Sequence, residues 1–297
     1  MTERMRVFDR RLVRLRRARL AADFAARGFL VREVVERLLD RLRDIRREFR
    51  RVLVLGAPMG LVERALRDRP GLELLVAADE VGVMLDSSGL RVVVDAEALP
   101  FAGDRFDLVL SPMLLHWVND LPGSLVQLRH SLTADGLLML AMPGGETLGE
   151  LREALTRAEL ECEGGASPHV SPFADLRDAG SLLQRAGFAM PVVDADRITV
   201  SYGDPLALMR DLGRMGEGNA LLQRRGGPLR RATLARACEV YAELFAGQDG
   251  RSPATFDILF LSGWKPHPSQ QKPAARGSAR FRLADALRVA EPGAPPP

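Results

Sequence analysis

The chain has 297 residues, of which 46% are hydrophobic, 27% charged and 5% aromatic, and its formal net charge is +3. These fractions are typical of a folded globular protein and argue against general disorder, and no apolar run reaches the roughly 18–20 residues that a membrane-spanning helix needs. Cys162 and Cys238 are too few for a disulfide framework or a cysteine-built zinc site, so a reducing compartment is expected.

The positive charge is concentrated at the N-terminus. Residues 1–20 hold eight arginines against Glu3 and Asp9, whereas the rest of the chain is slightly acidic. We expect this arm to be a solvated cap helix over the domain, with docking on an acidic partner or on an anionic membrane surface as alternatives. Nucleic acid is not an expected partner, because no aromatic residues are interleaved with the arginines. A secretory signal is not expected either, because the arm lacks an uninterrupted apolar segment.

The first half of the chain alternates between strand and helix patterns. Apolar residues at helical spacing predict helices at 5–20 and 29–48. Five apolar runs then read as strands, separated by candidate helices; the strands are 51–56, 72–77, 90–94, 106–111 and 136–142, and the helices are 61–66, 80–86 and 120–132. This alternation predicts right-handed βαβ units and a buried parallel sheet.

Beyond Pro143 the pattern changes. Helices are expected at 146–163, 174–186, 204–214 and 228–246, and strands at 187–201, which has room for a break, and 256–264. The predicted organisation is a basic helical cap at 1–48, a domain at 49–265 with an insertion at about 202–250, and a Pro/Ala-rich tail at 266–297. The composition of the tail predicts disorder, apart from a short helix at 283–290.

The ends of the first two predicted strands carry candidate binding residues, because an open parallel sheet binds ligands beyond the carboxyl ends of its strands. Gly56 and Gly60 allow a sharp turn and a close approach of a ligand to the backbone, although a plain strand-to-helix turn is an equally good interpretation. Asp79 stands where an acid accepts hydrogen bonds from ribose hydroxyls, and it is equally suited to capping a helix.

The next two strand ends add further candidates. Asp95, followed by Ala96, is placed to accept a hydrogen bond from an adenine amine, and Ser111 ends the fourth strand. His116 lies in the loop that follows, and a histidine there suits a general base, since histidine titrates near neutral pH. Its default interpretation is a packed helix face. Asp107 is expected to bind backbone groups at the start of its strand rather than to do chemistry.

The order of these four strand ends resembles the class I S-adenosylmethionine-dependent methyltransferases. The match covers about 45–200, and its clearest pieces are 104–111 and 132–138. A tighter resemblance, over about 5–280, links the chain to the mitochondrial complex I assembly factors of this fold that hydroxylate an arginine, and to their bacterial relatives. The segments that carry it are 7–10, 115–122, 144–148, 150–152, 163–173, 215–219, 253–255 and 263–265.

The resemblance implies a Rossmann-like α/β fold: a mostly parallel seven-stranded sheet with helices on both faces, an N-terminal helical cap and a helical insertion. It implies S-adenosylmethionine as cofactor and an arginine in the iron–sulfur subunit of respiratory complex I as substrate. It also implies a cytoplasmic location in bacteria and the mitochondrial matrix in eukaryotes. On this interpretation the substrate approaches over 111–117 and under 163–173. His116 would act as base, Trp117 would stack on a guanidinium, and His169 is a second substrate candidate, although a loop-ordering role suits it better.

The sequence departs from the methyltransferase pattern in the first loop. Val54 stands where the family has an acid, and Pro58 replaces the central glycine, which removes a backbone N–H and fixes φ. Two alternatives therefore stay open: a small-molecule or carrier-protein methyltransferase, and a degenerate, non-catalytic assembly protein. No metal site is expected, because none of the four histidines pairs with an acid at metal-ligand spacing.

Overall fold

The computed structural model describes residues 6–86 and 89–271, and the expected tail helix at 283–290 lies outside them. Residues 1–266 form one unit and residues 267–297 another. In the described part of the second unit, Ser269 Oγ lies 2.6 Å from Nδ1 of His267. The first unit contains the whole sheet and its helices.

The sheet follows from the apolar runs that were expected to be strands. Within the described residues its strands are β1 (Arg51–Leu55), β2 (Leu74–Asp79), β3 (Leu90–Val93), β4 (Phe106–Pro112), β5 (Leu132–Pro143), β6 (Ala189–Tyr202) and β7 (Ser252–Trp264). The order is β3-β2-β1-β4-β5-β7-β6. The pairs from β3 to β5 are parallel, and β7 is antiparallel to both of its neighbours. The predicted mostly parallel seven-stranded sheet is confirmed.

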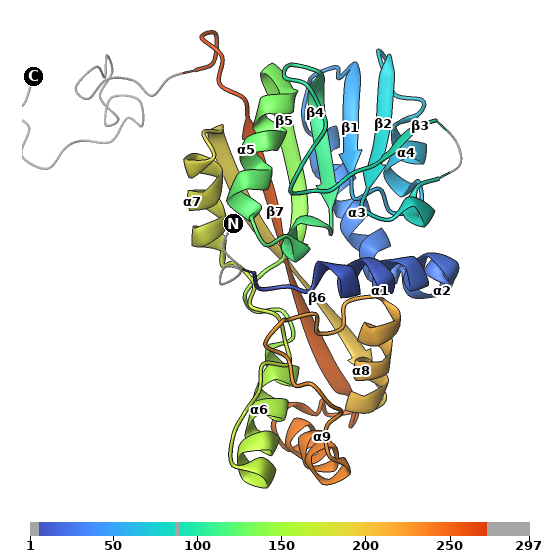
Figure 1. Cartoon of the computed structure of the whole chain (residues 1–297), viewed down its shortest axis with the longest axis vertical. Coiled ribbons are helices and arrows are strands. Elements are labelled where there is room, and N and C mark those ends of the chain that lie inside the picture. Colours follow the sequence, from blue (N-terminus) through green and yellow to red (C-terminus); the bar gives the residue numbers. More distant parts are fainter. Residues whose placement is uncertain (1–5, 87–88, 272–297) are drawn as a thin grey trace, which may run out of the picture. The chain divides into compact units, whose positions relative to one another are not determined.

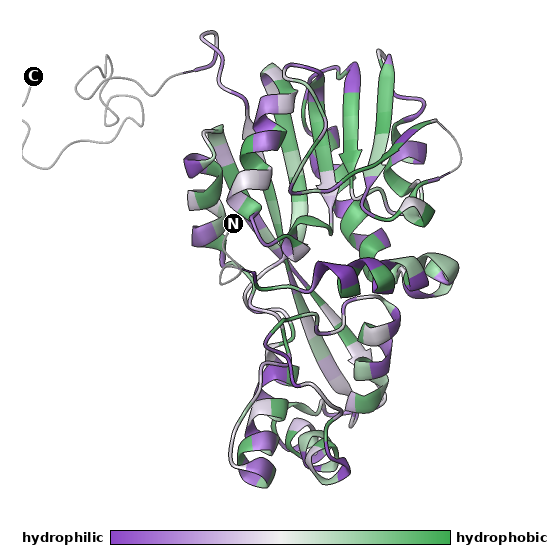
Figure 2. Ribbon diagram, viewed as in Figure 1, coloured by the Kyte–Doolittle hydropathy of each residue, from purple (hydrophilic) through white to green (hydrophobic). Residues whose placement is uncertain are grey.

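Helices cover both faces of this sheet, as Figure 1 shows. They are α1 (Arg10–Ala22), α2 (Phe24–Arg27), α3 (Phe29–Arg43), α4 (Leu61–Leu66), α5 (Leu121–Ser131), α6 (Gly149–Glu163), α7 (Leu176–Arg185), α8 (Pro205–Arg214) and α9 (Arg231–Phe245). Two large apolar clusters form most of the core. One packs α3, α4, α6, α8 and α9 against the sheet, and the other packs α5 and α7 against it. The central strands accordingly appear as mostly hydrophobic ribbons in Figure 2.

Several predicted element boundaries were wrong: β5 and β7 each begin four residues earlier than expected, and three helices differ. The helix expected at 80–86 is only a 3-10 turn, η2 (Gly82–Met84), because Asp79 and Val81 are held in an extended turn by a hydrogen bond from the Val81 N–H to Oδ1 of Asp79. The first helix begins at Arg10, since Phe8 pairs with Leu221 as an isolated β-bridge. The second helix ends at Arg43 instead of residue 48.

Two other expectations at the sheet were met. The break expected in 187–201 is present as a register shift between Ala189 and Val192, where β6 pairs with β7. Asp107 binds backbone groups as expected, accepting hydrogen bonds from the N–H groups of Arg50 at 2.8 Å and Arg51 at 2.9 Å. These bonds hold the start of β1 against β4. The strand order reverses between these two strands: β2 and β3 follow on one side of β1, whereas β4 and β5 follow on the other side.

That reversal fixes where a ligand can bind. Consecutive crossovers leave β1 and β4 toward opposite edges of the sheet, which opens a crevice beyond their carboxyl ends. In Figure 1 the arrowheads of β1 and β2 point toward α1, so the N-terminal helix lies across this edge. In Figure 2 α1 is among the most hydrophilic segments. A strongly basic helix therefore covers the edge where the sequence places its acidic candidates.

Candidate functional site

The loop after β1 turns through two glycines with positive φ. Gly56 has φ +84° and packs so closely that an added Cβ would lie 2.6 Å from Cβ of Leu114. Gly60, with φ +72°, precedes α4, and a Cβ there would meet the carboxylate of Asp86 at 2.5 Å. Both glycines are thus required by the chain's own packing.

Backbone hydrogen bonds within this loop are directed inward. The Gly56 N–H donates to the Ala78 carbonyl at 2.7 Å, and the Met59 N–H donates to the carbonyls of Ala57 and Met84 at 3.0 and 2.9 Å. Pro58 has no N–H to donate. A loop that cradles an anionic ligand needs outward-pointing N–H groups, so this loop is poorly equipped to hold the carboxylate of a cofactor.

Asp79, at the carboxyl end of β2, is fully buried and paired with an arginine of α1. Nη2 of Arg17 lies 2.6 Å from Oδ2 of Asp79, and the two side chains are 8% and 0% exposed. A second nitrogen of Arg17 reaches the Met113 carbonyl at 3.5 Å. Burial raises the pKa of Asp79, while Arg17 and the Val81 N–H act in the opposite direction. The carboxylate expected to accept ribose hydroxyls therefore holds a guanidinium in this structure.

A second group of acids binds Arg10 and Arg14. Arg10 donates to Glu80, Asp95 and Glu97, its Nη1 lying 2.6 Å from Oε2 of Glu97. Arg14 reaches Glu80 at 3.2 Å and Asp95 at 3.5 Å. Partial burial acts to raise the pKa of Asp95, but hydrogen bonds from Arg10 and from the Glu97 N–H outweigh it and hold that pKa below its usual range.

The backbone of Ala96 belongs to this same group, because its N–H donates to Oε1 of Glu80 at 3.2 Å. As expected of a cap, α1 covers this edge of the sheet, but the prediction that its arginines are solvated was wrong for one face of the helix. Arg10, Arg14 and Arg17 follow one another at helical spacing of three and four residues, so they lie on one face of α1 and all meet carboxylates. Composition revealed the charge, but only the fold brings that face to the acids.

The end of β4 and the loop after it hold buried polar atoms that have no partner among the described residues. They are Oγ of Ser111 in β4 and, in the loop, Nδ1 of His116 and Nε1 of Trp117; Nε of Arg17, on α1, is a further one, and another nitrogen of that side chain reaches the Met113 carbonyl in the loop. Buried polar groups normally have a protein or water partner, so a group of orphaned atoms at one loop indicates the place of a polar ligand or of ordered water. This loop borders the crevice that the strand order opens.

Trp117 does not offer a free ring face in the way expected. Its side chain is buried, Phe8 packs edge-on against it at 5.3 Å between centroids, and the His116 ring lies 4.9 Å away. Stacking of a substrate guanidinium on Trp117 would require Phe8 to move. Asn119 holds Phe8 in place through its Oδ1, which accepts from the N–H groups of Val7 and Phe8 at 2.7 and 2.8 Å.

His116 contacts an acid that sequence reasoning missed. Its Nε2 lies 3.2 Å from Oε2 of Glu217, in the loop after α8, and its ring lies 6.4 Å from that of Phe173. Both partners come from segments on which the family resemblance rests, 215–219 and 163–173. The motifs that contain these partners were recognised in the sequence, but their contacts with His116 were not, because Glu217 lies 101 residues from His116 in the chain.

His169 lies in a hydrogen-bonded loop, which fits the loop-ordering role better than a role in substrate binding. Its Nε2 is 3.1 Å from Oε1 of Glu159 and 3.2 Å from Oγ of Ser167, and the Ser167 N–H donates to Glu159 at 2.6 Å. Two cavities adjoin the segment. One, of about 190 Å³, contains Glu217 in its wall, and the other, of about 670 Å³, lies next to Arg6 and Arg152.

S-adenosylmethionine can be tested against these residues. The two acids expected to bind its ribose and adenine, Asp79 and Asp95, lie at or just after the carboxyl ends of β2 and β3, and the buried polar atoms Oγ of Ser111 and Nδ1 of His116 have no partner among the described residues. Both acids are paired with arginines of α1, however. In the first loop, Val54 replaces the family's acid, and Pro58 has no backbone N–H. The residues therefore fit the nucleoside half of the cofactor once the arginines of α1 have released Asp79 and Asp95.

In the part of the chain that the structure describes, no group of three or more His, Cys, Asp or Glu side chains is arranged to hold a metal ion. Among the same residues, no helix combines the length and the apolar character that crossing a membrane requires.

Comparison with known proteins gives a consistent family assignment. The methyltransferase domain family matches residues 25–191. The chain is 42% identical to the zebrafish (Danio rerio) protein named arginine-hydroxylase NDUFAF5, mitochondrial, over 96% of this chain and 91% of that one. The human protein of the same name is also 42% identical, over 96% and 84%.

Bacterial relatives and solved structures extend the comparison. A malonyl-[acyl-carrier protein] O-methyltransferase of Gallionella capsiferriformans is 33% identical over 91% of this chain and 95% of that one. A Bacillus halodurans structure assigned as a methyltransferase superposes with a TM-score of 0.54 at 16% identity, covering 78% of this chain and 99% of that one. At that identity the superposition demonstrates the shared fold.

Proposed function

Because this chain belongs to the methyltransferase domain family, we propose that it is a protein-modifying member of the family that acts on an arginine side chain of a partner protein. The observation that carries the proposal is the end-to-end similarity to proteins named arginine hydroxylases, which covers 96% of this chain at 42% identity. The methyltransferase family match supports S-adenosylmethionine as the cofactor.

The geometry adds support from the segments that first indicated the subfamily. Segments 7–10, 115–122, 163–173 and 215–219 are far apart in the chain, yet they meet around His116. Phe8 packs on Trp117, Glu217 pairs with His116, and Nδ2 of Asn219 donates to the Pro168 carbonyl at 2.7 Å. A site assembled from several distant segments is a better candidate for a specialised function than any one motif.

The partner is proposed to be the iron–sulfur subunit of respiratory complex I, on the strength of the same resemblance. When bound, S-adenosylmethionine supplies an electrophilic methyl group. This chain's own part would be to hold the ribose and adenine at Asp79 and Asp95, and to place His116 and Glu217 beside the substrate side chain. The relatives named as arginine hydroxylases are mitochondrial, so the compartment of this chain is proposed to be one that contains complex I.

Mass spectrometry of the partner tests the proposal. The purified subunit is incubated with this chain and S-adenosylmethionine in air together with a two-electron reductant, because insertion of one oxygen atom from O2 requires reduction of the other oxygen atom to water. Arginine-containing peptides are then searched for a gain of one oxygen atom or one methyl group. We expect a gain at a single arginine that is lost in His116→Asn and retained in His130→Asn, a matched control whose side chain is exposed. The proposal is refuted if no arginine peptide gains mass and the subunit does not co-purify with the chain.

A second candidate, a non-catalytic assembly protein, is favoured by one observation: α1 arginines occupy the acids that the nucleoside would use. Calorimetric titration with S-adenosylmethionine and S-adenosylhomocysteine separates the two. Saturable binding that is weakened in Asp95→Asn supports the enzyme. Absence of binding at millimolar cofactor, together with co-purification of the partner, supports the assembly protein.

A further inference from the structure

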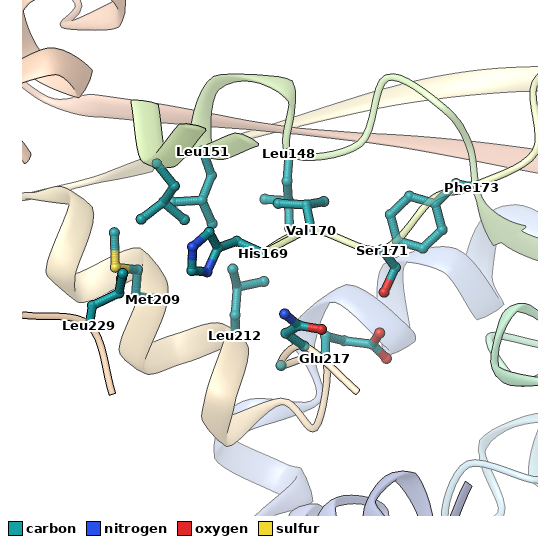
Figure 3. A pocket seen from close by; sticks show the side chains of 13 residues that line it. Leu148, Leu151, His169, Val170, Ser171, Phe173, Met209, Leu212, Glu217 and Leu229 are labelled. Atoms are coloured by element: carbon teal, nitrogen blue, oxygen red, sulfur yellow. The ribbon is translucent and has the colours of Figure 1, made fainter. Parts of the chain in front are cut away.

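The smaller cavity beside His169 has an apolar wall and one acidic end. Apolar side chains make up most of its lining, namely Leu148, Leu151, Leu155, Val170, Met209, Leu212 and Leu229. Figure 3 shows Leu151, Met209 and Leu229 gathered on one side, and the Glu217 carboxylate on the other, near Ser171 and Phe173. A long side chain with an apolar stem and a cationic head would match this arrangement.

Most polar groups in the lining already have partners. Oδ1 of Asn219 accepts from the Leu221 N–H at 3.0 Å and its Nδ2 donates to Pro168. His169 is engaged by Glu159 and Ser167. Glu217 differs, because among the described residues its carboxylate has one hydrogen-bonding contact, from Oε2 to Nε2 of His116. Its side chain is 15% exposed, so the second oxygen remains available to a ligand.

The charge of the cavity follows from these partners. Arg16 reaches the same loop, but it donates to the backbone carbonyls of Gly218 and Asn219. The Glu217 carboxylate therefore gives the cavity its negative end. A malonyl group or another anion would be repelled there, whereas a guanidinium would gain charge-assisted hydrogen bonds.

We infer that this cavity receives the substrate arginine, with the methylene stem against the leucines and the guanidinium on Glu217, next to His116. The inference rests on the proposed function, of which it names the substrate subsite. The volume of about 190 Å³ equals that of about six water molecules in the liquid, which is the scale of one side chain and not of a nucleoside. Arginine is favoured over lysine because its guanidinium is planar and less strongly hydrated.

Peptide binding to the purified full-length chain tests the inference. The probes are two fluorescein-labelled peptides that are identical except that a single arginine is replaced by citrulline, its neutral isostere, and anisotropy reports binding. A charge-assisted hydrogen bond makes the arginine peptide bind about 10- to 150-fold more tightly than the citrulline peptide. Glu217→Gln is expected to remove that preference, while Glu36→Gln, the same charge change at an exposed position of α3, leaves it intact.

A second variant protects the test against misfolding of Glu217→Gln, whose melting temperature is measured in parallel. Leu229→Trp fills part of the cavity from its half-buried wall and leaves Glu217 unchanged. It is expected to lower the affinity for the arginine peptide at least tenfold, on the scale of one lost favourable contact. Full arginine preference in Glu217→Gln, together with unaltered affinity of Leu229→Trp for the arginine peptide, overturns the subsite and leaves the proposed function standing. Equal binding of the two peptides to the unaltered chain overturns charge selection. If neither the arginine peptide nor the citrulline peptide binds, both the subsite and the proposed function are overturned.

Discussion

Replacing Arg17 by methionine is the most direct test of how α1 is held on the sheet. The change keeps the apolar stem and removes the guanidinium, which leaves the fully buried Asp79 without its 2.6 Å partner. Breaking a buried ion pair costs about 3–5 kcal/mol, because the remaining charge stays desolvated. For a domain of this size each kcal/mol lowers the melting temperature by about 2–4 °C, so a fall of about 6–20 °C is expected.

Three comparisons make this prediction specific. Arg50→Met removes an exposed pair with Glu73, in which the two side chains are 63% and 61% exposed, and should cost less than about 1 kcal/mol. Adding Asp79→Asn to Arg17→Met should restore part of the loss, since the buried charge is then gone. Because burial already raises the pKa of Asp79, protonation should also reduce the penalty of Arg17→Met as the pH falls.

Urea denaturation followed by circular dichroism measures the effect, with the slope against urea checked for a change in the denatured state. The reasoning is refuted if Arg17→Met and Arg50→Met lose the same stability. It is also refuted if the double variant is less stable than Arg17→Met. If the unpaired carboxylate of Asp79 causes the loss of stability, its replacement by an amide has to reduce that loss.

Other predictions concern the same edge of the sheet. The double variant Arg10→Ala/Arg14→Ala should bind S-adenosylmethionine between about twofold and thirtyfold more tightly in calorimetry, because the two ion pairs that these arginines make with the partly exposed Asp95, about 0.2–1 kcal/mol each, no longer compete; weaker binding would show that these arginines serve the cofactor. Burial raises the pKa of Glu63, whose carboxylate has no partner among the described residues, so stability should fall as the pH rises from about 4.5 through that raised value. Glu63→Gln should abolish this fall in pH-dependent melting, and an unchanged profile would contradict it. Gly56→Ala should lower stability by more than about 1 kcal/mol in urea, since φ is +84° and the new Cβ would strike Leu114; an unchanged midpoint would mean that the loop rearranges freely.

The sequence by itself determined the sheet and much of the family. Apolar runs of strand length separated by helical spacing are local signals, and burial in a parallel sheet demands them on every central strand. The strands β1 to β4 and β6 therefore lie within about two residues of their predicted positions, β5 and β7 each begin four residues earlier than predicted, and Asp107 anchors the backbone as expected. Failures occurred where a distant contact overrides local pattern, as at Phe8, whose bridge to Leu221 delays the start of α1.

Tertiary structure alone decided what the candidate residues touch. Asp79 and Asp95 were recognised as acids at strand ends, but their arginine partners come from some 60 to 85 residues earlier in the chain. Glu217 was present in a recognised motif, and only the path of the chain after α8 brings it to His116. The periodicity of apolar residues indicates which face of a helix is buried. It does not indicate which charged side chains meet across the fold, because the two partners of such an ion pair lie far apart in the sequence.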